Sequence, residues 1–150
     1  IAIVDVLVTV VDTTPPVLVC TTSEIALWPP NHANRTVDIC IAVSDNCPNP
    51  DALLIECLVS SSEPDDASGD GTNTGDVDGL DGFTEPVDVS NKLVYDPSLG
   101  CYFAQITLRA ERDGGNAGRV YSIVSNVLDT SGNSAVASCV VVVPHDKRKN

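Results

Sequence analysis

The sequence predicts an all-β protein, a β-sandwich of short strands with an extra strand at its N-terminus. Several short runs alternate apolar and polar residues, which is the period of a half-buried strand. Ten glycines and ten prolines punctuate these runs along the 150 residues. No long stretch places apolar residues at helical spacing, so helices are not expected to form the core.

Residues 1–11 (IAIVDVLVTVV) are predicted to be a strand that is apolar on both faces. One face carries Ala2, Val4, Val6, Val8 and Val10, and the other carries Ile1, Ile3, Leu7 and Val11 with Asp5 and Thr9. Such a strand is expected to be buried on both faces. The next residues, 12–16 (DTTPP), form a stiff linker, because proline lacks the N–H group that a central strand needs.

Residues 17–146 are predicted to form the sandwich, and 147–150 a basic tail. The expected strands cover residues 17–20 (continuing loosely to 27), 36–43, 53–59, 87–95, 102–110, 119–128 and 135–143. Polar turns separate them, and the longest connection is an Asp- and Gly-rich loop over residues 60–82. About seven strands at this spacing are typical of a β-sandwich.

The charge of the chain argues against nucleic acid as a partner. Asp and Glu number 21 against 8 Lys and Arg, for a net charge of −13, whereas phosphate binding needs clustered basic residues. Acidity instead favours solubility and cation binding. No apolar run reaches the roughly 20 residues that span a bilayer, so no membrane span is predicted.

The six cysteines predict disulfides. They are Cys20, Cys40, Cys47, Cys57, Cys101 and Cys139. Their number is even, their spacings are wide, and neither His32 nor His145 lies at zinc-ligand spacing. Disulfides imply an oxidising compartment and hence a secreted or cell-surface protein. Six cysteines allow 15 pairings, so spacing alone does not fix the connectivity.

A set of short motifs resembles the hyalin-repeat-like and related immunoglobulin-like modules of bacterial surface proteins. The motifs are DTTPPVL at 12–18, LWPPNH at 27–32, SDNC at 44–47, GDG at 69–71, LRAER at 108–112, GRVY at 118–121, DTSGN at 129–133 and VPHD at 143–146. They follow in order over nearly all of residues 12–146. Cys40, Cys57, Cys101 and the long acidic loop depart from the family pattern.

The resemblance implies an immunoglobulin-like Greek-key β-sandwich in which Cys20 and Cys139 tie the first strand to the last. That bridge closes a loop of over a hundred residues, which is worth about 4–5 kcal/mol in the chain-entropy treatment. Modules of this kind serve as spacers, adhesins and filament parts, so the fold alone does not select one function.

The other four cysteines are paired from their expected positions. Cys40 lies on the strand face opposite Ile39 and Ile41, and Cys101 opens a strand expected in the same sheet. Bridges Cys40–Cys101 and Cys47–Cys57 are therefore favoured. The alternative is one or two free, buried thiols.

The N-terminal strand is the feature that bears most directly on function. In tandem arrays of such modules it would be the last strand of the preceding module, and residues 135–143 already supply that strand here. One hypothesis is that residues 1–11, with Ile3, Val4, Val6, Val8 and Val10 as the donor-strand residues, add to another copy of the chain. Head-to-tail contacts that do not close give filaments. The alternatives are that the strand folds back as an eighth strand, or that it is a remnant of an array.

The Asp-rich loop is a candidate calcium site. Calcium takes six to eight oxygen ligands, which Asp side chains on a flexible Gly-rich loop can supply. The predicted ligands are Asp70, Asn73, Asp76 and Asp78. The alternative is a solvated acidic loop.

Three further residues have predicted roles. Asn34 heads the sequon Asn34-Arg35-Thr36 and is a candidate glycosylation site. Trp28 is expected to cap the core, and Tyr121 resembles the tyrosine corner of sandwich domains. Asp45 and Asp129 are expected to form turns through bonds to the backbone.

The sequence therefore predicts a structural subunit of an extracellular filament, polymerised head to tail with copies of itself. A calcium-dependent adhesion or spacer module of a larger secreted protein is the alternative, and a carbohydrate-binding accessory domain is the third. No catalytic residues are predicted, because no nucleophile-elbow, phosphate-loop or His-based metal motif occurs.

Overall fold

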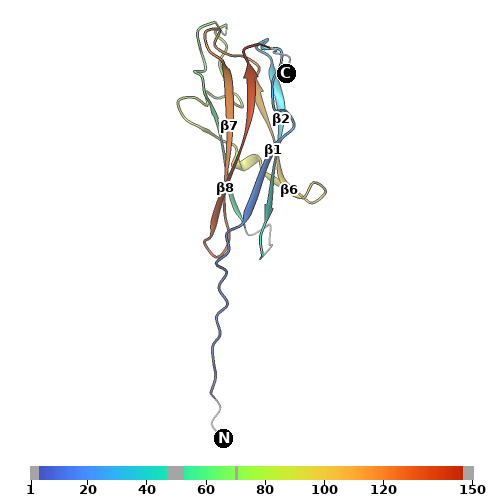
Figure 1. Ribbon diagram of the computed structural model, residues 1–150, viewed down its shortest axis with the longest axis vertical. Coiled ribbons are helices and arrows are strands. Elements are labelled where there is room, and N and C mark those ends of the chain that lie inside the picture. Colours follow the sequence, from blue (N-terminus) through green and yellow to red (C-terminus); the bar gives the residue numbers. More distant parts are fainter. Residues whose placement is uncertain (1–3, 47–52, 70, 147–150) are drawn as a thin grey trace.

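The computed structural model describes residues 4–46, 53–69 and 71–146, and these form two four-stranded antiparallel sheets (Figure 1). The first sheet has the order β1-β2-β6-β5 and the second β4-β3-β7-β8. The strands are β1 (Val17–Thr22), β2 (Asn34–Ser44), β3 (Leu54–Ser61), β4 (Val87–Asp88), β5 (Val94–Asp96), β6 (Cys101–Arg109), β7 (Gly118–Leu128) and β8 (Ser134–Pro144). The predicted all-β class is confirmed, and the two sheets fit a β-sandwich.

The sheets share one apolar core. Strand alternation sends every second side chain inward, so Val37, Ile39 and Ile41 of β2 are fully buried. The same cluster contains Val59, Ile106, Leu108, Tyr121, Ile123, Val141 and Val143 from β3, β6, β7 and β8. The core is thus built by strands of both sheets within residues 17–146.

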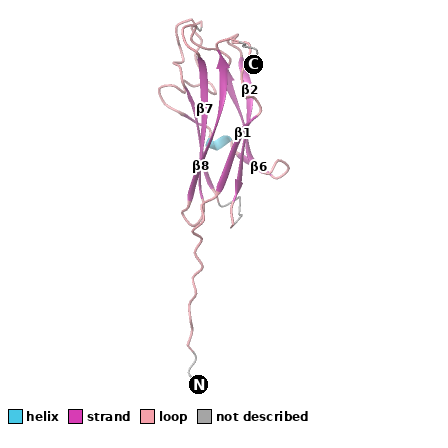
Figure 2. Cartoon of the chain, in the orientation of Figure 1, coloured by secondary structure: helices cyan, strands magenta, loops and turns pink. Residues whose placement is uncertain are grey.

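The N-terminal segment, residues 4–11, belongs to neither sheet. The structure has no strand before Val17 among the described residues, and Figure 2 draws this part as loop. The segment is extended and runs away from the sandwich (Figure 1). The alternative in which it folds back as an eighth strand is therefore not what the single chain adopts.

The predicted strand at 87–95 is wrong as one element. The chain breaks into β4, the 3-10 turn η2 (Ser90–Lys92) and β5, and it changes sheets on the way. The cause is a local turn in which Asp88 Oδ1 accepts hydrogen bonds from the Ser90 N–H and hydroxyl. Ser90 Oγ accepts in turn from the Cys57 N–H, and Val89 enters the core. The segment therefore closes one side of the sandwich.

The long acidic loop, residues 62–86, is attached to the sandwich at its centre. Val77 is fully buried in the core. The Asp78 N–H donates to the Thr107 carbonyl, and the Arg109 N–H donates to the Asp76 carbonyl. The middle of the loop therefore extends the first sheet beside the end of β6.

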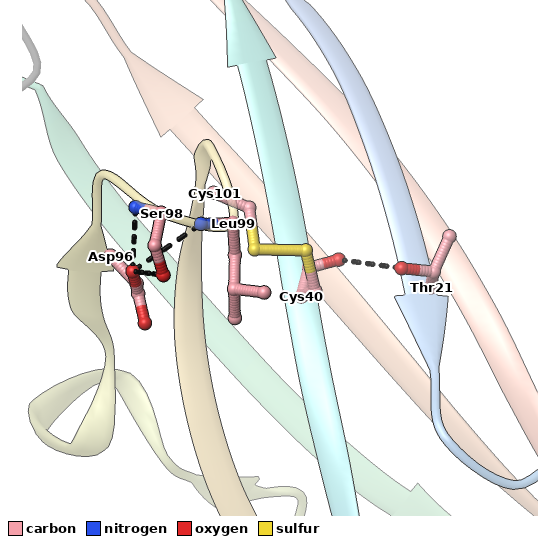
Figure 3. Close-up of a disulfide and its surroundings, with 6 residues drawn as sticks. All are labelled: Thr21, Cys40, Asp96, Ser98, Leu99 and Cys101. Carbon is pink, nitrogen blue, oxygen red and sulfur yellow. Dashed lines mark hydrogen bonds between the residues drawn. A yellow bond between two sulfur atoms is a disulfide. The ribbon is translucent and has the colours of Figure 1, made fainter.

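Two of the predicted disulfides are confirmed. Cys20–Cys139 joins β1 to β8 and so links the two sheets, with Cα atoms 5.5 Å apart. Cys40–Cys101 joins neighbouring strands β2 and β6, and Leu99 lies beside it (Figure 3). Both bridges close long loops, with sequence separations of 119 and 61 residues.

The predicted Cys47–Cys57 bridge is wrong, because Cys57 is a free, buried thiol. Cys57 and Val59 both point inward from β3 and belong to the core. The Ser125 hydroxyl contacts the Cys57 sulfur at 3.5 Å. Burial raises the pKa of this thiol, so it stays protonated and inert. Cys47 lies outside the described residues.

Tyr121 has the bonding of a tyrosine corner. Its ring is fully buried, and its hydroxyl donates to the Arg109 carbonyl at 2.8 Å. The bond ties β7 to the end of β6 across the two sheets.

Removing either disulfide is expected to destabilise the fold by a similar amount. In the chain-entropy treatment, Cys20→Ala/Cys139→Ala and Cys40→Ala/Cys101→Ala each cost about 4–5 kcal/mol, and nearly doubling the loop length adds only about 0.6 kcal/mol. Urea unfolding of the two double variants measures both values. A cost below about 1 kcal/mol for either pair would contradict the assignment of these bridges as structural.

Tyr121→Phe is expected to lower the free energy of unfolding by about 1–2 kcal/mol, because it leaves the Arg109 carbonyl without its donor. Tyr95→Phe is the matched control, since Tyr95 is partly exposed on the edge strand β5, and it should change stability by less than about 0.5 kcal/mol. Equal effects in urea unfolding would show that the buried hydroxyl contributes nothing specific.

Candidate functional site

The linker and two turns meet at one end of the sandwich. Val17 of β1 pairs with Ser44 of β2, and Leu128 of β7 pairs with Ser134 of β8. The residues before Val17, after Ser44 and after Leu128 therefore share this end, which we call the base. The N-terminal segment leaves the sandwich at the base (Figure 1).

Three carboxylates converge at the base. Asp12 comes from the linker, Asp45 from the turn after β2 and Asp129 from the turn after β7, and one oxygen from each lies within 4.8 Å of the others. Across the described residues, no Lys, Arg or His side chain pairs with any of the three. The base is therefore a concentrated negative charge that the chain itself does not neutralise.

Asp129 is held by its own turn, as predicted. Its Oδ1 accepts from the Ser131 and Asn133 N–H groups, both at 2.8 Å, and its Oδ2 accepts from Asn133 Nδ2 at 2.8 Å. The residue is only 7% exposed. Burial raises the pKa of Asp129, but the hydrogen bonds from Asn133 and Ser131 outweigh it. The net effect lowers the pKa, so the carboxylate is charged at neutral pH.

Asp12 is held at the base by hydrogen bonds from the turns after β2 and β7. Asn133 Nδ2 donates to its carbonyl at 3.2 Å, and Asn46 Nδ2 donates to its Oδ1 at 3.1 Å. The Thr14 N–H also donates to this Oδ1, at 2.9 Å, which closes a turn at the start of the linker. The segment before Asp12 is thus free in solvent, whereas Asp12 itself is fixed on the sandwich.

Asp45 has one engaged oxygen and one idle oxygen. Its Oδ1 accepts from the Asn46 N–H at 2.7 Å, which confirms the predicted turn. Its Oδ2 is shielded from solvent and has no hydrogen-bond partner. A buried carboxylate oxygen in that state is costly unless a cation balances it.

The donor set at the base suits a hard cation. Carboxylate oxygens are the ligands that calcium prefers, whereas zinc favours Cys and His. The described residues that could hold such an ion are Asp12, Asp45 and Asp129.

The N-terminal segment exposes its apolar side chains on both faces. Val4, Val6, Val8 and Val10 lie on one face, and Leu7 and Val11 on the other; their exposed fractions run from 67% to 93%. Ile3 lies outside the described residues. These side chains form a contiguous apolar strip, of the kind that marks an interaction site.

The predicted calcium ligands in the acidic loop have other partners where the structure describes them. Asp76 is fully buried and pairs with Arg119, and Arg109 Nε lies 3.4 Å from its Oδ1. Asp78 pairs with Lys92, Asn73 is half-buried, and Asp70 lies outside the described residues. The carboxylates of Asp76 and Asp78 thus already have cations of the chain as partners, and a calcium site in this loop stays a prediction.

Arg119 and Arg109 attach the loop to the sandwich. Arg119 also contacts Glu63, with Nε 3.4 Å from Oε2, and it donates to the Pro64 carbonyl at 3.0 Å. Arg109 donates to the Thr74 carbonyl at 2.5 Å. The alternative of a merely solvated acidic loop is therefore wrong for its buried centre.

The sequon and the tryptophan lie close together. Asn34 begins β2 and is exposed, so a glycan there would meet no steric barrier from the core. Trp28 is 38% exposed and lines a shallow pocket with Asn34 and Arg35. Trp28 is not among the residues of the core cluster or the side chains packed against it, so its predicted role as a cap of the core is not confirmed. Glycosylation of Asn34 stays a prediction.

From the sequence, Asp45 and Asp129 are expected only to form turns, and their convergence with Asp12 is not predicted. Asp45 and Asp129 directly follow β2 and β7, and Asp12 lies in the linker before β1. Antiparallel pairing of β1 with β2 and of β7 with β8 puts these positions at one end. That signal exists in the sequence, but it requires the strand order to be known. Among the described residues, the group of carboxylates close enough to share an ion therefore lies at the base and not in the acidic loop.

Comparisons with family models, curated proteins and solved structures returned no match. Among the described residues, no helix is long and apolar enough to cross a membrane.

Acid is expected to weaken the attachment of the loop through Asp78. Burial raises the pKa of Asp78, but the hydrogen bond and charge of Lys92 and the bonds from Thr107 outweigh it, so the pKa is lowered. The stabilisation is complete above the unfolded pKa of about 3.9 and is lost as the pH falls through the lower folded value. Urea midpoints measured from pH 6 down to pH 2 should fall less steeply for Asp78→Asn than for the unchanged chain. Parallel curves would contradict this role.

Proposed function

We propose that the chain is a structural subunit of an extracellular filament. Each copy is an immunoglobulin-like Greek-key β-sandwich of the hyalin-repeat-like kind and lends residues 1–11 to the next copy, head to tail. The two disulfides support an oxidising, extracellular setting, where such bridges persist.

The observation that carries this proposal is the exposed N-terminal segment. Residues 4–11 are extended, and their apolar side chains face water on both sides. Water can satisfy the backbone N–H and C=O groups of such a segment, but exposure of the apolar strip is unfavourable. A partner that takes up the segment as an added strand would bond its backbone N–H and C=O groups and also bury its apolar side chains.

Burial of this strip can drive association. Burying a Val or Leu side chain is worth about 1.5–3 kcal/mol, and Val4, Val6, Val8 and Val10 share one face of an extended strand. Several such burials can exceed the cost of ordering the segment and of joining two molecules. The segment is therefore long enough and apolar enough to act as a donor strand.

The direction of the segment favours a chain of copies over a closed pair. It leaves at the base and points away from its own sheets (Figure 1). The donor surface and the acceptor surface are then different parts of the molecule. Contacts between unlike surfaces repeat along a fibre unless the rotation happens to close a ring.

The second candidate is a calcium-dependent adhesion or spacer module of a larger secreted protein. It is favoured by the completeness of the core, which contains no residue of the N-terminal segment. A sandwich closed in this way can stand in a tandem array, with residues 1–11 as the end of a preceding module. The two candidates differ in whether the isolated chain polymerises.

Deletion of residues 1–11 tests the filament. We expect the intact chain to form filaments, seen by electron microscopy and sedimentation, and the shortened chain to stay monomeric. The shortened chain should keep its fold, because the segment contributes nothing to the core. Folded monomers from both chains would overturn the filament proposal in favour of the spacer module.

Two matched substitutions test whether assembly depends on the apolar face of the segment and not merely on its presence. Val8→Asp puts a charge on the uniformly apolar face, whereas Thr9→Asp adds the same charge to the face that already carries Asp5. Val8→Asp should raise the concentration needed for assembly more than tenfold, since 1.4 kcal/mol is tenfold in an equilibrium constant. Thr9→Asp should have the smaller effect. Equal effects would contradict burial of the Val4, Val6, Val8 and Val10 face.

A further inference from the structure

We propose that the outer face of the sheet β4-β3-β7-β8 is a contact surface for the same face of a second copy of the chain. This contact is separate from the donor strand, because it uses a different surface of the molecule. It holds in either proposed function.

The outer face of this sheet carries an apolar patch. Leu54 of β3 lies directly opposite Leu128 of β7. Val124 of β7 lies diagonal to Val136 and Val140 of β8. The exposed fractions of the five side chains run from 37% to 70%. The five therefore point away from the core on one face and are spread over three neighbouring strands.

The same face is nearly free of charge. Among the outward residues of β7 and β8, all of which lie in the described part of the chain, none is charged. The charges on the outer face of this sheet are Glu56 of β3 and Asp88 of β4, toward its far edge. A chain with a net charge of −13 repels its own copies wherever carboxylates meet. Two copies can therefore approach each other through this face at little electrostatic cost.

Polar groups on the patch favour a second copy over a lipid surface. Ser122, Asn126 and Ser138 alternate with the apolar residues of β7 and β8. Hydroxyl and amide groups that entered hydrocarbon would lose their hydrogen bonds with water, whereas the same groups of a facing copy can replace those bonds. A second copy therefore matches both the apolar and the polar residues of the face.

The size of the face fits a weak contact. A strand spacing of about 4.8 Å and a rise of about 3.3 Å per residue give β3, β7 and β8 together a face of about 500 Å². Two such faces would bury about 1,000 Å², which is near the lower limit for a specific interface. A face that meets its own copy about a two-fold axis forms a closed pair. We therefore expect pairs with a dissociation constant of about 0.1–1 mM.

This face and the N-terminal segment point in different directions. The segment extends from the base along the long axis of the molecule, whereas the face runs along the side of the sandwich (Figure 1). In a filament, the contact would join two filaments side by side, and its repetition along them would strengthen a bond that is weak between single copies. At the micromolar concentrations of electron microscopy, the chain lacking residues 1–11 would still be monomeric.

Nuclear magnetic resonance of the chain lacking residues 1–11 tests the contact, because this chain keeps its core and has no donor strand. Over about 0.05–2 mM, a range that includes the expected dissociation constant, the methyl signals of Val124, Val136 and Val140 should shift with concentration. The methyl signals of Val94, on the edge strand β5 of the other sheet, should stay in place.

Two matched variants of this shortened chain locate the contact. Val136→Asp and Val94→Asp make the same change at side chains that are 66% and 68% exposed, on edge strands of different sheets. Val136→Asp should weaken pairing at least about tenfold, because it places like charges in the contact. Val94→Asp should pair as the shortened chain does.

Either of two results would overturn the contact. One is that the signals of the three valines stay constant up to about 2 mM, which is above the expected dissociation constant. The other is that the two variants have equal effects. Neither result bears on the filament, since every sample lacks residues 1–11, and the filament is scored separately by electron microscopy of the intact chain.

Discussion

The two sheets close around one core without any side chain from residues 4–11, and this leaves the apolar strip of the segment in solvent. Inward side chains of β2, β3, β6, β7 and β8 fill the interior, and the Cys20–Cys139 bridge joins the sheets. Since the interior is complete, an apolar strip outside it has no place in its own chain. Water solvates its backbone but not its valines. In the proposed filament, another copy of the chain covers this strip, and the exit of the segment at the base leaves it accessible to that copy.

Much of the fold could be predicted from residue patterns. Alternation located the cores of β2, β3, β6, β7 and β8 to within a few residues, because a side-chain period of two marks a half-buried strand. Cys40 on the outer face of β2, opposite Ile39 and Ile41, led to its bridge with Cys101. The resemblance to hyalin-repeat-like modules supplied Cys20–Cys139. The bonding of Tyr121 also followed its predicted role.

The errors arose where local bonds or distant partners outweigh the pattern. Residues 87–95 look like one strand, but the turn at Asp88 and Ser90 sends the chain from one sheet to the other. A bridge from Cys57 to Cys47 is predicted, yet the place of Cys57 on the inner face of β3 makes it a free thiol of the core. Asp76 is a residue type that binds calcium, but its carboxylate forms ion pairs with Arg119 and Arg109. Asp12, Asp45 and Asp129 are far apart in sequence, so only strand pairing reveals them as one group.

The proposed filament requires that residues 4–11 be buried between copies of the chain. Amide hydrogen exchange of the N-terminal segment measures this directly, because a strand paired with a sheet exchanges slowly and a solvated segment exchanges fast. If the filament proposal is right, the amides of residues 4–11 exchange fast in dilute monomer and become protected in concentrated, assembled chain. Fast exchange of the segment at every concentration, in a chain whose core amides stay protected, would contradict it.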